Sequence, residues 1–282
     1  MKNHSTSIYI PPKVVKYINI ILVCMPFLCL YSIFTLFTIQ NSLIYKTKTQ
    51  DHKMHGFTNY NKLITADNTI LDTYMWDKKE NVDLIVFHGS IVKISNHNKI
   101  CLKFFNNMNV NVLTLFYRGF KTQQERPDEI GIMLDVYAFF EYVIKERKDK
   151  RYVLYGTSMG CATALYFANL LIANNIKNFI MIIENPFYNF TNLITQKYLF
   201  LSFICSEKWP NDKRIANLKK IEIPILLILS GKDEIIDNKN GLKLIKNTSN
   251  CEVFRNHEAT HFNGYKYENF HIKINQFINE KS

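Results

Sequence analysis

The chain has 282 residues, 47% of them hydrophobic and 14% aromatic, which suits one domain of about 200–250 residues and an appendage. With only 9 Gly and 7 Pro it is neither collagenous nor of low complexity. The net charge of +11 comes from scattered lysines without a basic stripe interleaved with aromatic residues, so we expect no nucleic-acid partner.

The first predicted element is the uncharged apolar segment INIILVCMPFLCLYSIFTLFTI, at residues 18–39. A helix of this length crosses a bilayer of about 30 Å. The alternative is a cleaved signal peptide, whose apolar region would have about 7–15 residues and end at small residues. We therefore expect a polar tail at residues 1–17, a transmembrane anchor at 18–39 and a juxtamembrane connector at 40–61.

Basic residues near the span give its expected orientation. Lys13 and Lys16 lie close before the segment, and Lys46 and Lys48 follow it. The lysines before the span favour a cytosolic N-terminus, because basic flanks tend to stay cytoplasmic. We expect a single-pass protein of an endomembrane or the cell surface, with its folded domain lumenal or external.

Residues 62–282 contain alternating strand and helix patterns. Residues 63–76, LITADNTILDTYMW, alternate apolar and polar side chains around Asp67-Asn68, which is typical of an antiparallel hairpin. The strands expected after it are VDLIVFHG, VNVLTLFYRG, RYVLYG, NFIMIIENP, IPILLILSGKDE and CEVFRNHEATH, and the expected helices span 95–108, 128–147, 159–172, 238–247 and 265–279. Unbroken apolar strands alternating with helices predict an α/β fold with a mainly parallel central sheet flanked by helices.

An irregular stretch at residues 187–220, rich in Phe, Leu and Tyr, separates the fourth and fifth of these parallel strands. Its position predicts a small cap over a site. The alternative is that its apolar side chains form a second membrane-associating element.

Six cysteines occur in the chain, without a C-x-x-C pair or a His/Cys cluster of metal-binding spacing. We therefore expect buried small hydrophobic side chains, not a disulfide framework. Neither a metal nor a cofactor is expected.

The motif GTSMG at residues 156–160 follows an apolar strand and precedes a helical pattern. A G-x-S-x-G sequence in that context places the serine on a sharp turn between strand and helix. Gly156 and Gly160 are needed there because a Cβ atom would clash with the neighbouring strand and helix. Ser158 is therefore the candidate nucleophile, and the alternative is an ordinary serine in a turn.

Serine needs a general base oriented by a carboxylate, and on this kind of turn the chain order is serine, acid, histidine. Asp233 follows the strand ILLILSG, and His261 follows the final strand. Both positions lie at the edge where catalytic groups collect in open α/β sheets. The competing residues are Glu234 and Asp237 for the acid and His257 for the base.

An oxyanion needs two preorganised N–H donors. The backbone of Met159, at the start of the helix after the serine, is expected to supply one. The turn after VFHG is expected to supply the other, from Ser90. His88 in that turn is expected to be a buried loop residue and not the base.

The motifs FHGS, FYRGF, GTSMG, IENPF, SGKDEII and THFNGY follow the order of the α/β-hydrolase superfamily. From about Gln40 onward the chain most resembles the membrane-anchored branch of alpha/beta hydrolase domain-containing protein 13, which includes the bud-emergence-like fungal proteins. The resemblance implies an α/β-hydrolase fold, the triad Ser158, Asp233 and His261, and Met159 and Ser90 as oxyanion donors. It also implies a structural ion pair between Arg118 and Asp135.

The chain departs from that family at two loops. The family usually has H-G-N-x-G-N where this chain has HGSIVK, and D-Y-R-G-x-G-x-S where it has FYRGFKTQQ. Both departures concern the oxyanion loop and the mouth of the site. The triad residues are intact.

The sequence therefore predicts a membrane-anchored serine hydrolase of ester or thioester substrates, with acyl or lipid-like substrates implied by the resemblance and the anchor. One alternative is a catalytically weak hydrolase-fold protein that acts as a membrane scaffold or binding module. Another is a serine peptidase, although nothing in the sequence favours an amide over an ester.

Overall fold

The computed structural model describes residues 11–47, 53–91, 93–121, 125–197 and 205–281. The chain forms two compact units, Met1–Gln40 and Asn41–Ser282. The first contains most of α1 (Pro12–Ile44), a helix without buried residues that extends beyond the predicted span at both ends. With a mean hydropathy of 2.4 in its most apolar part, α1 is long and apolar enough to cross a membrane.

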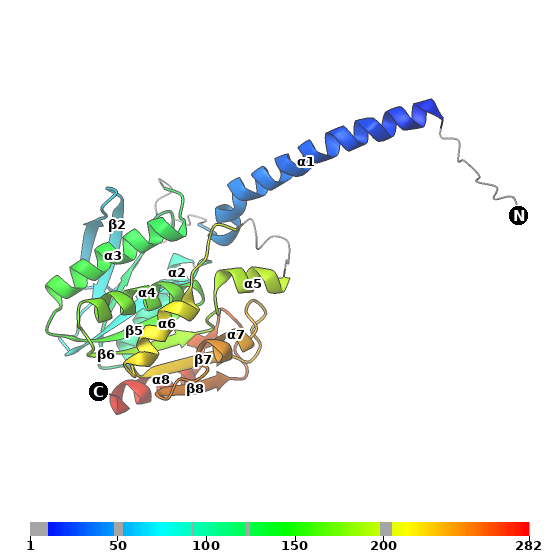
Figure 1. The fold of residues 1–282 in the computed structure, drawn as a ribbon. Coiled ribbons are helices and arrows are strands. Elements are labelled where there is room, and N and C mark those ends of the chain that lie inside the picture. Colours follow the sequence, from blue (N-terminus) through cyan, green and yellow to red (C-terminus); the bar gives the residue numbers. More distant parts are fainter. Residues whose placement is uncertain (1–10, 48–52, 92, 122–124, 198–204, 282) are drawn as a thin grey trace, which may run out of the picture. The chain divides into compact units, whose positions relative to one another are not determined.

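The second unit is built on one eight-stranded sheet (Figure 1). Its strands, in spatial order, are β1 (Asn59–Ile64), β2 (Ile70–Trp76), β4 (Asn111–Leu115), β3 (Val82–Phe87), β5 (Arg151–Thr157), β6 (Phe179–Glu184), β7 (Ile225–Ser230) and β8 (Cys251–Asn256). β2 pairs antiparallel with β1 and β4, and all later pairs are parallel. This confirms the predicted hairpin and mainly parallel sheet, in the strand order of the α/β-hydrolase fold.

Five helices match the predicted segments closely, and two more form within the stretch 187–220, which was predicted to be irregular. They are α2 (Ile94–Asn107), α3 (Glu129–Glu146), α4 (Met159–Ala173), α5 (Phe190–Lys197), α6 (Asn211–Lys220), α7 (Lys239–Leu244) and α8 (Glu268–Glu280), with the short 3-10 helix η2 (Gly264–Lys266) before α8. The predicted helix at 265–279 is therefore divided, because Tyr267 has an extended backbone (ψ 136°) between η2 and α8.

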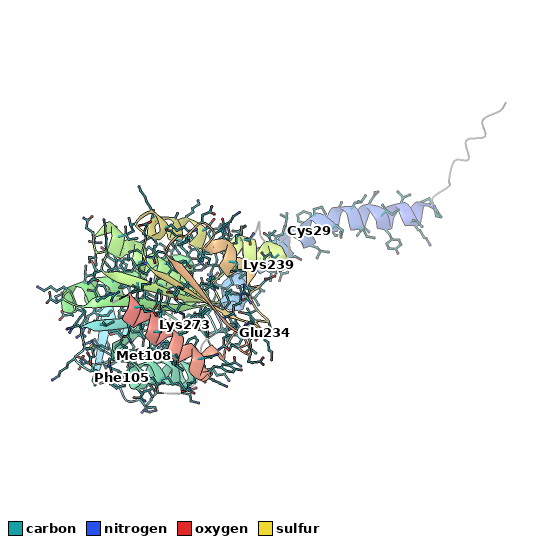
Figure 2. All side chains as sticks on the ribbon, turned by 90° about the horizontal axis from the view of Figure 1, so that it is seen from below. Cys29, Phe105, Met108, Glu234, Lys239 and Lys273 are labelled. Atoms are coloured by element: carbon teal, nitrogen blue, oxygen red, sulfur yellow. The ribbon has the colours of Figure 1, made fainter. Side chains whose placement is uncertain are left out.

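The helices cover both faces of the sheet. On one face α3 and α6 pack against α4, and the ring of Phe87 in β3 lies 5.5 Å from that of Phe167 in α4. On the other face Tyr155 in β5 contacts Phe104 of α2 and Phe270 of α8. Phe87 pairs with the residue after Tyr155, so the two rings point to opposite faces. Figure 2 views the α2 and α8 face, with Phe105 of α2 and Lys273 of α8 labelled.

The folded unit begins earlier in the chain than the expected domain boundary at residue 62. β1 starts at Asn59, inside the expected connector. Tyr45 and Met54, only 2% and 4% exposed, belong to the hydrophobic core. The polar composition of residues 46–61 conceals these two large side chains, and their burial ties the segment to the domain.

The segment predicted as a cap divides into two parts. α6 packs against α4 and belongs to the helical layer. α5 lies nearer the strand ends (Figure 1), and residues 198–204 lie outside the described residues.

The ion pair between Arg118 and Asp135 is confirmed. Asp135 is fully buried, and its Oδ1 accepts hydrogen bonds from Nε and an Nη of Arg118, at 2.9 and 2.8 Å. Arg118 also binds Asp67 in the β1–β2 turn at 2.7 Å. The pair therefore joins the loop after β4 to α3 and to the hairpin.

Cysteine burial partly follows the prediction. Cys101, Cys161 and Cys205 are buried and free, whereas Cys24 and Cys29 are free and exposed on α1.

Candidate active site

Ser158 lies on the turn between β5 and α4, at the carboxyl end of the parallel strands. Its φ of 56° and ψ of −121° are dihedrals that non-glycine residues rarely adopt. The Ser158 N–H donates to the carbonyl of Glu184 in the adjacent β6, at 2.9 Å, and its carbonyl accepts from the N–H of Cys161 at 3.0 Å. The neighbouring strand and helix therefore hold the serine in this strained conformation.

The two glycines of GTSMG are required by close backbone approach. A Cβ atom at Gly156 would lie 2.7 Å from the backbone nitrogen of Cys161. A Cβ atom at Gly160 would lie 2.8 Å from the carbonyl carbon of Phe87 and would overlap its oxygen. Glycine at these positions lets the start of α4 rest directly on the ends of β3 and β5.

Asp233 and His261 lie together, although 28 positions separate them in the chain. His261 Nδ1 and Asp233 Oδ2 are 2.7 Å apart, and the two side chains are 2% and 1% exposed. The other carboxylate oxygen accepts the backbone N–H groups of Ile235 and Ile236, both at 2.8 Å. Three hydrogen bonds therefore fix the carboxylate, which leaves Nε2 of the imidazole directed to the other side.

The competing residues take different positions. Glu234 accepts the backbone N–H of His261 at 3.2 Å, not its ring. Asp237 accepts the backbone N–H of Lys239 at 2.8 Å, at the start of α7. His257 is exposed in the loop after β8. Among these residues, Asp233 is the carboxylate that contacts the His261 ring.

The loop after β3 approaches the serine from the other side. A Cβ atom at Gly89 would lie 3.4 Å from the Cβ of Ser158, so the backbone next to Ser90 runs close to the nucleophile turn. Ser90 lines the same pocket as Ser158. Its carbonyl accepts the backbone N–H of Lys46 at 3.0 Å, which links this loop to the segment that follows α1.

His88 is a buried ring below that loop, with no solvent exposure. Burial lowers its pKa to about 4, so the ring is neutral at physiological pH. Its Nδ1 lies 2.9 Å from the Gly89 carbonyl, and its ring centroid lies 4.1 Å from that of Tyr117. These contacts give His88 a packing role under the loop.

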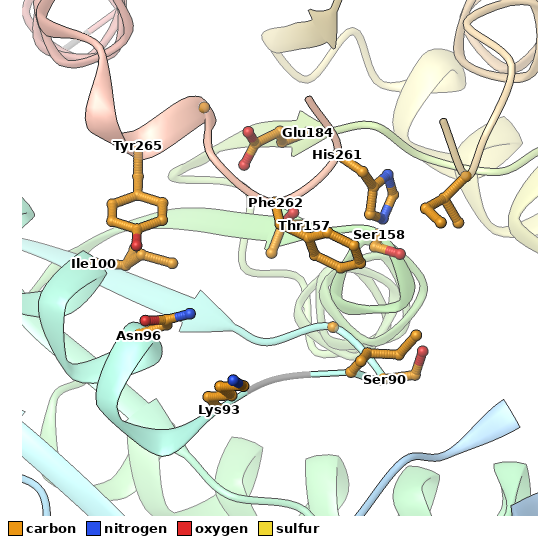
Figure 3. A pocket seen from close by; sticks show the side chains of 14 residues that line it. Ser90, Lys93, Asn96, Ile100, Thr157, Ser158, Glu184, His261, Phe262 and Tyr265 are labelled. Atoms are coloured by element: carbon orange, nitrogen blue, oxygen red, sulfur yellow. The ribbon is translucent and has the colours of Figure 1, made fainter. Parts of the chain in front are cut away.

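A pocket of about 100 Å³ opens beside Ser158 (Figure 3). Ser158 and His261 are at one end, where the imidazole points toward the serine, and Ile100 and Tyr265 are at the other. Among the described residues, those of the segment 187–220 do not line it. A cap over the site therefore remains a prediction. Part of the predicted cap, residues 198–204, lies outside the described residues.

Besides Thr157 of the GTSMG motif, sequence reasoning missed four polar residues of this pocket. Lys93 and Asn96 come from the start of α2, Tyr265 from η2, and Glu184 from the end of β6. Glu184 is only 3% exposed. An acid at the end of an otherwise apolar strand run was the available signal, because such strands end at the edge where active sites form.

Comparison with known proteins agrees with this architecture. No protein-family model matches the chain. The chain is 28% identical to protein Bem46 of Schizosaccharomyces pombe over 62% of its length. It is 27% identical to an uncharacterized membrane protein of Saccharomyces cerevisiae over 89% of its length. It is 21% identical to the lysophosphatidylserine lipase ABHD12 of Danio rerio over 62% of its length. These matches cover 60%, 92% and 50% of the respective relatives.

Solved structures share the fold at lower identity. An α/β hydrolase from Vibrio vulnificus superposes with a TM-score of 0.70 at 18% identity, over 85% of this chain and 92% of its own. An esterase from Pyrococcus furiosus gives 0.59 at 17% identity, over 84% and 98%.

The strand order, the strained serine turn and these similarities define an α/β hydrolase with esterase and lipase relatives. Within that superfamily its similarity to Bem46 and to the yeast membrane protein supports the Bem46-like branch.

Proposed function

We propose that this protein is a membrane-anchored serine hydrolase that cleaves ester or thioester bonds of acyl substrates. The observation that carries the proposal is the contact between His261 Nδ1 and Asp233, at 2.7 Å, beside a serine on a strained turn. That arrangement matches the requirement of a serine nucleophile for an oriented base.

In the proposed reaction, Ser158 Oγ forms a bond to the substrate carbonyl carbon while Nε2 of His261 takes its proton. The carbonyl π electrons move to the oxygen, which becomes an oxyanion. When the tetrahedral intermediate collapses, the bond to the leaving group breaks, and that alkoxide or thiolate takes the proton from His261. Water then attacks the acyl-enzyme carbonyl in the same way: His261 takes a proton from the water, and it returns the proton to Ser158 Oγ when the acid product leaves. Asp233 holds the tautomer of His261 and stabilises the imidazolium.

The oxyanion would lie between two backbone donors. Met159 is the first residue of α4, where N–H groups are not used within the helix and the helix dipole favours negative charge. Ser90 would supply the second N–H from the loop that passes Ser158. A single donor of this kind is worth about 3–4 kcal/mol of transition-state stabilisation.

Apolar side chains at the pocket support an acyl substrate. Ile91 and Phe262 line the pocket, yet they are 45% and 50% exposed. Pockets for drug-sized ligands have about 300–1,000 Å³, so a volume of about 100 Å³ accommodates only the reacting end of a long acyl chain. The rest of such a chain would extend across Ile91 and Phe262.

Membrane anchoring is proposed through α1, with the domain on the lumenal or external side. The helix has the length and hydropathy of a span, and one relative is named as a membrane protein. An anchored domain would meet acyl substrates that partition into the same bilayer.

Labelling of the full-length protein by a fluorophosphonate probe tests the hydrolase proposal, with Ser158→Ala as the negative control. We expect the wild-type protein to label and the variant not to. Equal labelling of both would exclude the serine mechanism and favour the scaffold alternative.

Competition for the label identifies the substrate. A panel of acyl esters, acyl thioesters and peptide amides, each with short and long acyl groups, would compete in proportion to its reactivity. We expect esters or thioesters to compete and amides not to, whereas preferential competition by amides would indicate a peptidase.

Extraction of membranes with alkaline carbonate tests the anchor. We expect the full-length protein to stay in the pellet and a Leu22→Arg/Leu30→Arg variant to enter the supernatant. Release of the wild-type protein would contradict the anchor, and digestion of its domain by protease outside sealed microsomes would contradict the lumenal orientation.

A further inference from the structure

Glu184 is a buried carboxyl group for which the proposed mechanism has no role. One of its oxygens accepts a hydrogen bond from the hydroxyl of Tyr155 in β5. Its side chain lines the pocket together with Ser158 and His261 (Figure 3). A carboxyl group removed from water beside reacting groups is costly, so its presence calls for an explanation.

The residue connects the nucleophile turn to the loop that carries His261. Its carbonyl accepts the N–H of Ser158 at 2.9 Å. Its other carboxylate oxygen packs on the backbone of Gly264, where a Cβ atom would overlap it. Gly264 in THFNGY therefore leaves room for Glu184 of IENPF, and the carboxyl group lies against the loop three residues after His261.

The next residue extends the connection to Asp233. The side chain of Asn185 donates to Ser230 Oγ at 2.9 Å and accepts the N–H of Ser230 at 2.8 Å. Ser230 ends β7, three residues before Asp233, and its carbonyl accepts the N–H of Asp233 at 3.3 Å. Glu184 and Asn185 thus contact all three segments that carry the proposed triad.

Burial raises the pKa of Glu184 to about 7, and the Tyr155 hydrogen bond and the charge of His261 oppose that rise. Burial also raises the pKa of Tyr155, so its hydroxyl stays a neutral donor. The titratable and charged groups that face Glu184 or share its pocket are Tyr155 of β5, Cys161 of α4, Asp233 after β7, His261 after β8, Tyr265 of η2 and Lys93 of α2.

We propose that Glu184 is a positioning residue that holds the His261 loop against the serine turn and, through its charge, sets the pH range over which His261 acts as a base. The proposal rests on the proposed serine mechanism. Asp233 orients the ring at Nδ1, whereas Glu184 acts across the pocket without occupying either ring nitrogen.

The direction of the effect follows from the charges. An ionised Glu184 favours the protonated form of the His261 imidazole, because opposite charges attract. His261 is a base only when it is neutral, so a negative Glu184 moves the acid limb of the pH–rate profile to higher pH. Because the titrations of Glu184 and His261 are coupled, the acid limb of the wild-type pH–rate profile reflects both of them.

The test is the pH dependence of probe labelling in the full-length protein, with each variant normalised to its own plateau. In Glu184→Gln we expect the acid limb to move to lower pH by about one unit. Tyr155→Phe removes one of the two side-chain donors that favour ionised Glu184, the other being Thr157, so the acid limb of this variant should move the same way by a smaller amount. Tyr152→Phe is the matched control, because its hydroxyl donates to the Arg147 carbonyl at the opposite end of β5, and its limb should not move.

The outcomes separate the two proposals. Wild-type labelling no stronger than that of Ser158→Ala would defeat the serine mechanism itself. If the wild-type protein labels but Glu184→Gln keeps the wild-type acid limb, the role of Glu184 is refuted, even when its plateau or melting temperature falls. A limb that moves to higher pH would refute it as well.

Discussion

Gly160→Ala is the substitution whose effect follows most directly from the geometry of the serine turn. The new Cβ atom would lie 2.8 Å from the carbonyl carbon of Phe87 and 3.0 Å from the carbonyl oxygen of His88. Non-bonded carbon atoms prefer about 3.5–4.0 Å, so the two backbones must separate by about 1 Å. The atoms that the new Cβ meets belong to the backbone, so a change of side-chain rotamer cannot relieve the clash.

The displacement would separate the proposed oxyanion donors. Gly160 follows Met159 in α4, and His88 precedes the loop that carries Ser90. A misplacement of about 1 Å at an active site costs about 100-fold in rate, which corresponds to about 2.7 kcal/mol. Overpacking of this kind also destabilises a fold by about 1–3 kcal/mol.

The assay compares kcat/KM for a short acyl ester and the denaturation midpoint of the full-length protein in detergent. Gly241→Ala is the control, because its Cβ atom would meet side-chain carbons and not backbone: those of Leu229, Leu227 and Pro186, at 3.0, 3.2 and 3.4 Å. We expect that control to keep most of its activity. A Gly160→Ala variant with wild-type kcat/KM would refute the assignment of this turn to the oxyanion site.

Three further substitutions test the domain. Asp233→Asn should lower kcat by about 10⁴-fold because the amide favours the wrong tautomer of His261; hydrolysis within tenfold of wild type would exclude Asp233 as the orienting acid. Tyr45→Phe leaves the buried carboxyl group of Glu207 without its hydroxyl partner, so the free energy of unfolding should fall by about 1–3 kcal/mol; an unchanged urea midpoint would contradict that role. Asp135→Ala removes the fully buried partner of Arg118, which keeps only its ion pairs with the more exposed Asp67 and Glu125. The substitution should cost about 3–5 kcal/mol, measured by the same unfolding; a loss below about 1 kcal/mol would show that the ion pair is not structural.

The fold was predictable because its signals are local. Apolar runs without alternation indicated strands buried on both faces, and the hairpin around Asp67-Asn68 was recognisable from its alternation. The helices were recognisable from their apolar spacing. The early start of the domain was not recognisable, since Tyr45 is one aromatic residue between an apolar helix and a polar segment.

The candidate site was predictable only in part. Chain order and strand ends indicated Ser158, Asp233 and His261, and their roles as a triad stay a prediction that labelling tests. The choice of Asp233 over its neighbours needed the structure, because an acid one residue later in the loop contacts a backbone N–H and not the ring. Glu184 was missed: its place at the end of an apolar strand indicated the edge of the sheet where sites form, but not that its carboxyl group turns into the pocket.

The sequence by itself determined the strands and most of the helices, which serine lies on a strand-to-helix turn, and which helix can span a membrane; it did not indicate α5 and α6. These properties depend on residues within a few positions of one another. Only the tertiary structure decided that Glu184 lies against Gly264 and that Lys46 holds the carbonyl of Ser90. Such contacts join residues tens of positions apart, and they exist because sheet pairing and helix packing bring separate loops to one edge of the sheet.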